Sequence, residues 1–182
     1  MAASLAFSHF GFFVTDMPRM EDFYTRFMGF TVTDRGMLFD RNLVFLSRDP
    51  REHHQLVLVT GRPADMGYNV VHQISFLVDG LAELKDMHDR LKDEQVSEIA
   101  PVSHGNALSV YFRDPEGNRI ELYTPSPWYV GQPYGRQLDL TAPAETIRSL
   151  TLDMIKNDPT FTTREAWEAA MKARMSGAPV AG

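Results

Sequence analysis

Hydrophobic and polar positions follow a pattern that occurs twice within the first two thirds of the chain. Each copy opens with a mostly apolar run, at residues 7–14 and 70–78, which predicts a β-strand. Apolar residues at spacings of three and four then predict one helix per copy, at residues 17–28 and 81–91. Shorter strand-like runs complete the copies, at residues 30–33, 43–46 and 55–59 and at residues 98–102, 108–112 and 119–123.

This repetition predicts a βαβββ module that is present twice. The modules span residues 5–60 and 69–124, and residues 61–67 form the linker. Turn signals separate the strands at residues 34–36, 49–50 and 114–118. We expect an α+β fold in which the two modules, related by a pseudo-twofold axis, pair into one curved mixed sheet around a shared metal site. Together they form one domain at residues 1–125.

Residues 126–182 differ in character and form a C-terminal extension. Prolines interrupt its first part, which also carries Trp128, Tyr129 and Tyr134. Helical patterns follow at residues 144–155 and 163–175, and Thr163 is placed as an N-cap. We expect the extension to cover sheet edges or to build a subunit interface of a homo-oligomer. Its aromatic stretch fits a roof over a pocket and simple surface packing equally well.

The composition narrows the possible functions. The chain of 182 residues has a net charge of −6 and no basic cluster, which argues against nucleic-acid and membrane partners. Its apolar runs are too short to span a bilayer, and its first residues do not resemble a signal peptide, so we expect a cytoplasmic location. The absence of cysteine excludes disulfides and thiolate chemistry, and leaves His, Asp and Glu as metal ligands.

Three residues at equivalent places in the repeat are candidate metal ligands. His9 and His72 lie in the two opening runs, so a pseudo-twofold arrangement would bring their rings towards one point. Glu121 alternates with apolar neighbours in the last predicted strand, and a carboxylate on the concave face of a sheet needs a partner such as a divalent cation. Two histidines and a carboxylate form the facial triad of non-haem Fe(II) sites. The same residues also fit two core histidines and an exposed glutamate.

A longer motif surrounds Glu121. Val102-Ser103-His104 is followed by Val110-Tyr111, Asp114-Pro115-Glu116-Gly117 and Glu121, with intervals of five, two and three residues. This string resembles the signature of the type I extradiol ring-cleaving dioxygenases of the vicinal oxygen chelate (glyoxalase/bleomycin resistance/dioxygenase) superfamily, in a single-domain form. The resemblance covers about residues 5–127.

A second stretch, residues 52–58, resembles the part of these dioxygenases that carries a catalytic histidine outside the metal coordination sphere. His54 matches better than its neighbour His53, and only one of two successive strand residues can face the cavity.

The resemblance implies an enzyme that inserts O₂ into a catechol-type aromatic diol and cleaves the ring adjacent to the diol. It implies Fe(II), less often Mn(II), with the ligands His9, His72 and Glu121. The catalytic residues that it implies are His54 as an acid–base group, Tyr111 beside a substrate oxygen, and His104 as a hydrogen-bond donor to the same region. The implied partners are a small aromatic diol and O₂.

Alternative functions on the same fold stay open at this point. A glyoxalase-type isomerase generally uses a fourth metal ligand on the closing strand of the first module, where this chain has no carboxylate but where His54 could stand. A non-catalytic small-molecule-binding protein usually lacks the ligands that this chain keeps. A metal-binding relative with a changed reaction is a further alternative.

Overall fold

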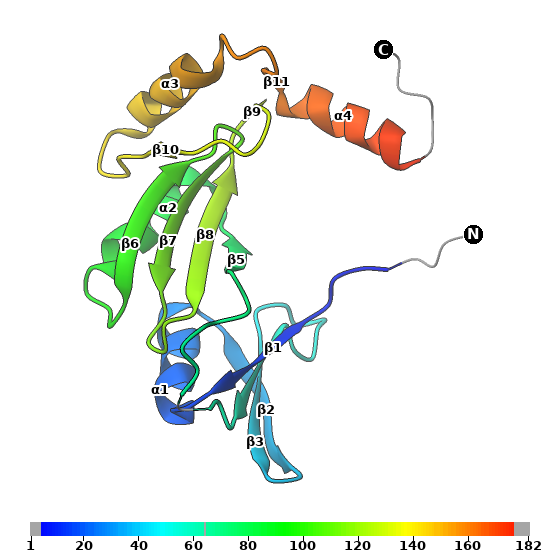
Figure 1. Ribbon diagram of the computed structural model, residues 1–182, viewed down its shortest axis with the longest axis vertical. Coiled ribbons are helices and arrows are strands. Elements are labelled where there is room, and N and C mark those ends of the chain that lie inside the picture. Colours follow the sequence, from blue (N-terminus) through cyan, green and yellow to red (C-terminus); the bar gives the residue numbers. More distant parts are fainter. Residues whose placement is uncertain (1–4, 64, 177–182) are drawn as a thin grey trace. The chain divides into compact units, whose positions relative to one another are not determined.

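The computed structural model describes residues 5–63 and 65–176, which divide into two compact units. The first unit extends to Val71 and includes the turn Asp114–Asn118, and the second comprises His72–Arg113 and the residues from Arg119 onward. Each unit contains one βαβββ module with its own mixed sheet (Figure 1). The prediction of an α+β fold is confirmed.

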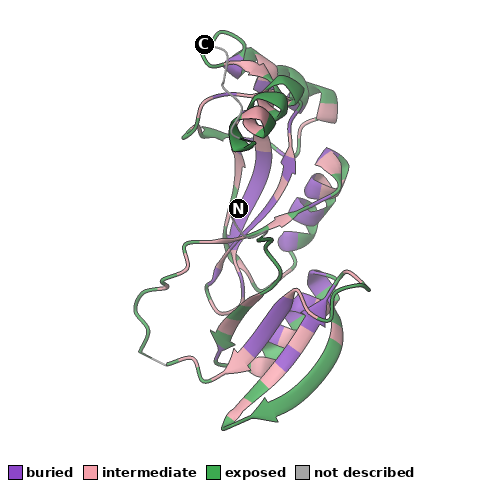
Figure 2. Cartoon of the chain, turned by 90° about the vertical axis from the view of Figure 1, so that its right-hand side faces the viewer, coloured by how far each residue is buried: buried purple, intermediate pink, exposed green. Residues whose placement is uncertain are grey.

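The first unit is built on a four-stranded sheet with the order β1-β4-β3-β2. Its strands are β1 (Phe10–Val14), β2 (Thr31–Leu38), β3 (Arg41–Ser47) and β4 (Leu56–Thr60), and β1 runs parallel to β4. Helix α1 (Met17–Asp22) continues into a short π-helix, η1 (Phe23–Phe27), and packs against β4. The helical face predicted from the spacing is buried: Met20, Phe23, Tyr24, Phe27 and Met28. Figure 2 shows the contrast between these buried parts and the exposed edge strand β2.

The second unit is built on a five-stranded sheet with the order β10-β6-β7-β8-β5. Its strands are β5 (Ile74–Leu77), β6 (Ser97–Ser103), β7 (Ala107–Arg113), β8 (Arg119–Pro125) and β10 (Arg136–Gln137), and β5 runs parallel to β8. Helix α2 (Gly80–Leu91) packs on β7 and β8. Its predicted apolar face is buried: Leu81, Leu84, Met87, His88 and Leu91.

The extension adds β9 (Trp128–Tyr129), α3 (Ala144–Ile155), β11 (Thr162–Thr163) and α4 (Arg164–Met175) to the second unit. Both helices agree with the sequence pattern, and the Thr163 hydroxyl accepts a hydrogen bond from the Ala166 amide as the predicted N-cap. The rings of Tyr129 and Trp167 stack with centroids 5.0 Å apart, so Tyr129 packs within the extension. Strand β10 pairs with β6 at the edge of the sheet.

The turn between β7 and β8 belongs to the first unit and is bonded to other residues of that unit. Glu116 accepts hydrogen bonds from the backbone amides of Thr15 and Asp16 at 2.6–2.9 Å and forms an ion pair with Arg62 at 3.3 Å. Asp114 is buried, and its carboxylate accepts a hydrogen bond from the Tyr24 hydroxyl at 3.1 Å. The Asp114 carboxylate also accepts bonds from the backbone and side-chain amides of Asn118. The acidic residues of this turn therefore have structural roles.

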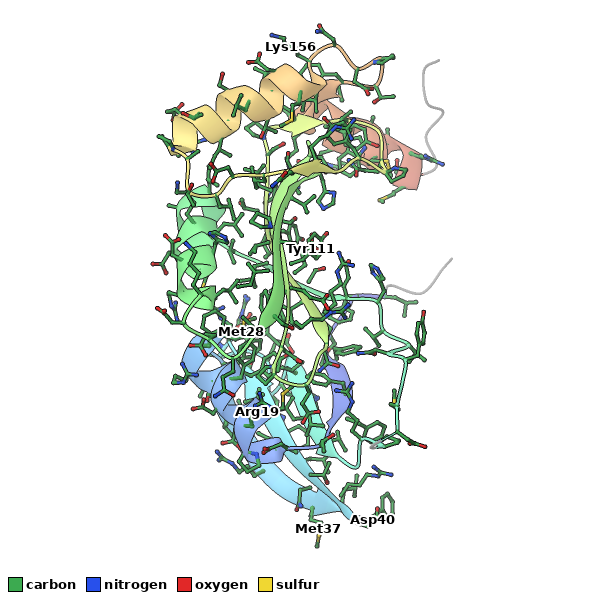
Figure 3. The ribbon with its side chains drawn as sticks, turned by 60° about the vertical axis from the view of Figure 1, so that its left-hand side comes forward. Arg19, Met28, Met37, Asp40, Tyr111 and Lys156 are labelled. Carbon is green, nitrogen blue, oxygen red and sulfur yellow. The ribbon has the colours of Figure 1, made fainter. Side chains whose placement is uncertain are left out.

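The structure departs from the sequence pattern at several places. His9 and His72 were predicted on strands, but the strands begin after them, at Phe10 and Ile74. The predicted turn at residues 34–36 lies inside β2, because the chain reverses later, at Phe39, whose φ is 55°. Figure 3 labels Met37 and Asp40 at the end of this hairpin. The described strands of the two modules form two separate sheets where one was expected, because each module completes its sheet with its own parallel strand pair.

Within the described residues, no helix combines the length and the apolar character that a membrane crossing requires.

Candidate functional site

Three polar side chains lie in one row across the sheet of the second unit. Ser75 on β5 is in register with Glu121 on β8, and Glu121 is in register with Tyr111 on β7. Residues that are directly opposite on neighbouring strands project from the same face, so the backbone pairing alone brings these side chains together. Figure 3 shows Tyr111 on this sheet.

The Glu121 carboxylate is the centre of this row. Its Oε1 accepts hydrogen bonds from the hydroxyls of Tyr111 at 2.6 Å and Ser109 at 2.8 Å. Its Oε2 accepts bonds from the Ser75 hydroxyl at 2.6 Å and the Gln73 amide at 2.8 Å. Glu121 is only 8% exposed, and none of the ion pairs within the described residues includes it. Four neutral donors, two at each oxygen, therefore satisfy this buried carboxylate.

Tyr111 connects Glu121 with His104. The Tyr111 hydroxyl lies 2.9 Å from Nε2 of His104, and the Arg119 guanidinium lies over the phenol ring at 4.4 Å from its centroid. Burial, together with the hydrogen bond to Glu121 and the charge of that carboxylate, raises the pKa of Tyr111 well above its usual value, although Arg119 opposes the shift. The hydroxyl is therefore protonated at neutral pH and acts as a hydrogen-bond donor.

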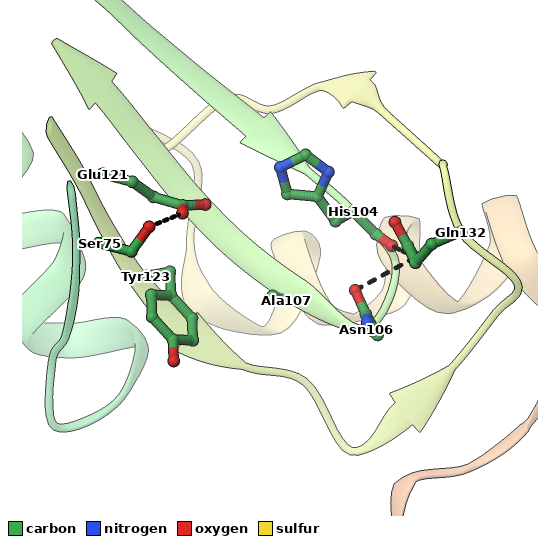
Figure 4. A pocket seen from close by; sticks show the side chains of 7 residues that line it. All are labelled: Ser75, His104, Asn106, Ala107, Glu121, Tyr123 and Gln132. Atoms are coloured by element: carbon green, nitrogen blue, oxygen red, sulfur yellow. Dashed lines mark hydrogen bonds between the residues drawn. The ribbon is translucent and has the colours of Figure 1, made fainter. Parts of the chain in front are cut away.

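An open pocket with a volume of about 310 Å³ lies beside this row. Glu121, Ser75 and Tyr123 line one side of it, and His104, Asn106 and Gln132 line the other (Figure 4). Ala107 completes the lining. The pocket therefore combines residues of the sheet with one residue of the C-terminal extension, and its size suits a small molecule.

The first unit brings the candidate histidines of the first module together. The rings of His9 and His54 have centroids 4.3 Å apart, and Nδ1 of His54 lies 2.9 Å from Nδ1 of His53. Phe45 lies against His54 with centroids 5.2 Å apart. Desolvation lowers the pKa of His54, and the neighbouring His9 and His53 lower it further. His54 is therefore neutral near pH 7, in the form that can accept a proton or bind a metal.

The predicted site residues thus fall into two groups, each within one unit. His9 and His54 lie together in the first unit, and His104, Tyr111 and Glu121 lie together in the second. His72 is exposed and precedes β5. Among residues 5–63 and 65–176, no three His, Asp or Glu side chains are grouped so that they could hold a metal. The facial triad of His9, His72 and Glu121 stays a prediction.

The sequence reasoning missed the residues that hold Glu121 and His104. Ser75 and Ser109 interrupt apolar strands at the face of Glu121, which is a usable signal, but only the register between strands shows that they meet the carboxylate. Gln132 gave no signal, because it lies in the extension among prolines and its contacts depend on the tertiary structure.

Sequence comparison identifies two curated relatives with a common activity. The chain is 28% identical over 157 residues to biphenyl-2,3-diol 1,2-dioxygenase 2 of Rhodococcus globerulus. The aligned segment covers 76% of this chain and 80% of the relative. It is also 28% identical over 130 residues to biphenyl-2,3-diol 1,2-dioxygenase 3 of the same organism. This second aligned segment covers 67% of this chain and 64% of that relative.

Solved structures show the same fold. A glyoxylase/bleomycin resistance protein/dioxygenase domain from Frankia sp. EAN1pec matches with a TM-score of 0.58 and 18% identity, covering 68% of this chain and 100% of that domain. The fosfomycin resistance protein FosX of Listeria monocytogenes, solved with Mn(II) and sulfate, matches with a TM-score of 0.51 and 18% identity, covering 69% of this chain and 95% of FosX. At these identities the likeness concerns the fold.

The family model of the Glyoxalase/Bleomycin resistance protein/Dioxygenase superfamily matches residues 6–122, which include both modules and end just after Glu121. The extension from residue 126 onward lies outside this match. The match covers most of the chain, and it agrees with the repeated βαβββ modules and with the polar row around Glu121. The protein therefore belongs to the Glyoxalase/Bleomycin resistance protein/Dioxygenase superfamily.

Proposed function

We propose that the protein is an extradiol dioxygenase, which inserts O₂ into a catechol-type aromatic diol and cleaves the ring adjacent to the diol. The observation that carries this proposal is the hydrogen-bonded row of His104, Tyr111 and Glu121, whose two ends, His104 and Glu121, line a small-molecule pocket. The two curated relatives support it, because both are named for the oxygenation of a biphenyl diol.

We propose His9, His72 and Glu121 as the ligands of Fe(II), with Mn(II) as the second choice. The donor set fits such a metal, because the chain has no cysteine and Glu121 is a buried carboxylate without an ion-pair partner among the described residues. Imidazole and carboxylate ligands of this kind are typical of non-haem iron. When bound, the metal would supply Lewis acidity and a path for electrons between diol and oxygen.

The protein side chains would bind and orient the diol. Tyr111 keeps its proton at neutral pH and donates it to Glu121 in this structure, and it would redirect this hydrogen bond to a substrate oxygen that binds next to Glu121. His104 would stabilise the same oxygen through the Tyr111 hydroxyl that it contacts. His54 is neutral near pH 7 and would serve as the acid–base group.

The test is an assay of O₂ consumption with iron-loaded protein. The chain is purified without air, loaded with Fe(II), and mixed in air with a panel of catechols that includes 2,3-dihydroxybiphenyl. We expect O₂ uptake with formation of a yellow ring-opened product. If iron-loaded protein consumes no O₂ with any diol of the panel, the proposal is wrong.

A second candidate function is a glyoxalase-type isomerase. The specific observation in its favour is the contact of His54 with His9, because it brings a second imidazole beside a proposed metal ligand, as a fourth ligand of such an isomerase would require. This function predicts turnover of a hemithioacetal with Ni(II) or Zn(II) and no O₂ uptake. The same assay with both substrates therefore separates the two functions.

A further inference from the structure

The turn that carries His104, between β6 and β7, is held by the C-terminal extension. The Ser126 hydroxyl donates a hydrogen bond to the Gly105 carbonyl at 2.5 Å, and the Ser126 amide donates to the Asn106 carbonyl at 3.0 Å. A Cβ added to Gly105, whose φ is +71°, would lie 2.5 Å from Val130 Cγ1. The turn therefore fits closely against the extension and needs a glycine at this position.

The same segment contacts the ring of His104. Its Nδ1 lies 2.7 Å from the backbone carbonyl oxygen of Tyr134. A carbonyl can only accept a hydrogen bond, so Nδ1 must carry a proton. In the neutral ring Nε2 then has the lone pair, and it lies 2.9 Å from the Tyr111 hydroxyl, where it competes with Oε1 of Glu121 for the single hydroxyl proton. The Tyr134 carbonyl thus selects one tautomer and one orientation of the ring.

Gln132 links this carbonyl to the turn. Its Nε2 lies within hydrogen-bond distance of the backbone carbonyls of His104 at 2.9 Å and Val130 at 3.1 Å, and of Oδ1 of Asn106 at 3.3 Å. Its Oε1 accepts a hydrogen bond from the Tyr134 amide at 3.1 Å. One side chain therefore fixes both the backbone of His104 and the residue whose carbonyl orients the His104 ring. Figure 4 shows the Gln132 side chain beside the turn of His104 and Asn106.

We propose that Gln132 and the backbone carbonyl of Tyr134 are positioning residues of the active site, which hold His104 so that Nε2 faces Tyr111. The extension is thereby part of the catalytic structure, although it lies outside the segment that matches the superfamily. This inference rests on the proposed function, in which His104 and Tyr111 act on the diol. Partners that orient a metal-ligating imidazole contribute about 10- to 100-fold to metal affinity or activity, and we expect an effect at the lower end of this range for an imidazole that is not a ligand.

The test compares Gln132→Met, which keeps a side chain of similar length without its hydrogen bonds, with the unchanged chain. The first measurement is the tautomer of His104, from long-range ¹H–¹⁵N spectra of full-length protein with labelled histidine and without added iron. We expect His104 to carry its proton on Nδ1 in the unchanged chain. In Gln132→Met we expect a mixture of tautomers. An unchanged Nδ1-protonated ring in the variant would overturn the inference.

Two matched controls separate positioning from general damage. Gln137→Met makes the same change at an exposed position of β10 and should leave the His104 tautomer unchanged. Tyr134→Phe removes the Tyr134 hydroxyl but keeps its carbonyl, so it should also leave the tautomer unchanged. A changed tautomer in Tyr134→Phe would mean that the Tyr134 side chain, and not its carbonyl, orients His104, and the proposal would then be wrong.

The second measurement is catechol turnover. We expect Gln132→Met to lower kcat about tenfold with little change in KM, because the variant misplaces a catalytic group without removing a metal ligand. A change in KM alone would make Gln132 a substrate contact and overturn its positioning role. If the unchanged chain cleaves no catechol, the proposed function fails, while the tautomer measurement still decides whether Gln132 positions His104.

Discussion

Tyr111 and Glu121 are cross-strand partners whose side chains are joined by a hydrogen bond of 2.6 Å between the phenol hydroxyl and Oε1. Both residues are 8% exposed, so water competes little for this bond. The carboxylate and the burial raise the pKa of Tyr111, which keeps the hydroxyl protonated. Glu121 lines the pocket, and Tyr111 joins it directly to His104, which lines the pocket as well, so this wall suits recognition of a small polar ligand such as a diol.

Replacement of Tyr111 tests the role of this donor. We expect Tyr111→Phe to lower kcat about 100-fold, in the range of a lost acid–base or hydrogen-bonding group. Iron occupancy should stay unchanged, because Glu121 keeps three other hydrogen-bond donors. Steady-state kinetics and metal analysis check both points, with Tyr68→Phe, at an exposed loop position, as the control. A Tyr111→Phe variant with full activity would exclude Tyr111 from catalysis.

Replacement of Glu121 tests the metal site. Glu121→Gln keeps the size of the side chain but loses the negative charge, so we expect iron to fall from about one per chain to a small fraction of that value. The measurement is metal analysis after anaerobic loading. Glu98→Gln, at an exposed ion pair with Arg113, is the matched control and should bind iron normally. Equal iron content in both variants would remove Glu121 from the metal site.

His54 separates the two candidate functions. We expect His54→Phe to retain iron and to lose most turnover, because the proposed role of His54 is proton transfer at a ring that is neutral near pH 7. Iron content and O₂ uptake are measured on the same sample. Should this variant lose its metal to the same extent as Glu121→Gln, His54 would be a ligand, which favours the isomerase.

Glu116 is expected to stabilise the fold and not to affect chemistry directly. Glu116→Ala leaves the amides of Thr15 and Asp16 without their acceptor and removes the partner of Arg62, so we expect a loss of about 2 kcal/mol in the free energy of unfolding. Urea denaturation measures the loss. Glu145→Ala removes only an exposed ion pair with Arg148 and should cost less than about 0.5 kcal/mol. Equal stability of the two variants would contradict the role of Glu116.

His88 should make stability depend on pH. It is buried on α2, and its Nδ1 has no hydrogen-bond partner among the residues that the structure describes. Desolvation chiefly lowers its pKa, helped by Lys92 and Lys85, against the opposing charges of Asp89 and Asp139. Because the pKa of His88 is lower in the folded chain, the folded chain binds fewer protons than the unfolded one. The stability that is present above about pH 6.5 is therefore lost as the pH falls through the folded-state pKa.

The check is urea denaturation of the unchanged chain and of His88→Leu between pH 7.5 and 5. We expect the unchanged chain to lose stability towards pH 5 more steeply than His88→Leu, because the variant has no group to protonate at this position. Parallel curves for the two proteins would show that His88 does not control the acid sensitivity.

The elements of the fold were largely predictable from the sequence, for a local reason. The face of α2 that contains Leu81, Leu84 and Leu91 is buried as its spacing predicted, because an amphipathic helix has one way to remove its apolar face from water. The end of β2 was not predictable in this way. A polar Asp-Arg-Gly sequence favours a turn locally, but pairing with β3 extends the strand through it.

The sequence by itself determined the α+β class and the two modules, whereas the roles of His104, Tyr111 and Glu121 that its motif implied stay predictions. The complete triad, the homo-oligomer and the cytoplasmic location stay predictions. Only the tertiary structure decided that Ser75, Ser109 and Gln73 hold the Glu121 carboxylate and that Gln132 supports His104. The physical reason is that strand register and contacts of the extension join residues distant in the chain, and the periodicity of a single segment contains no information about its partners.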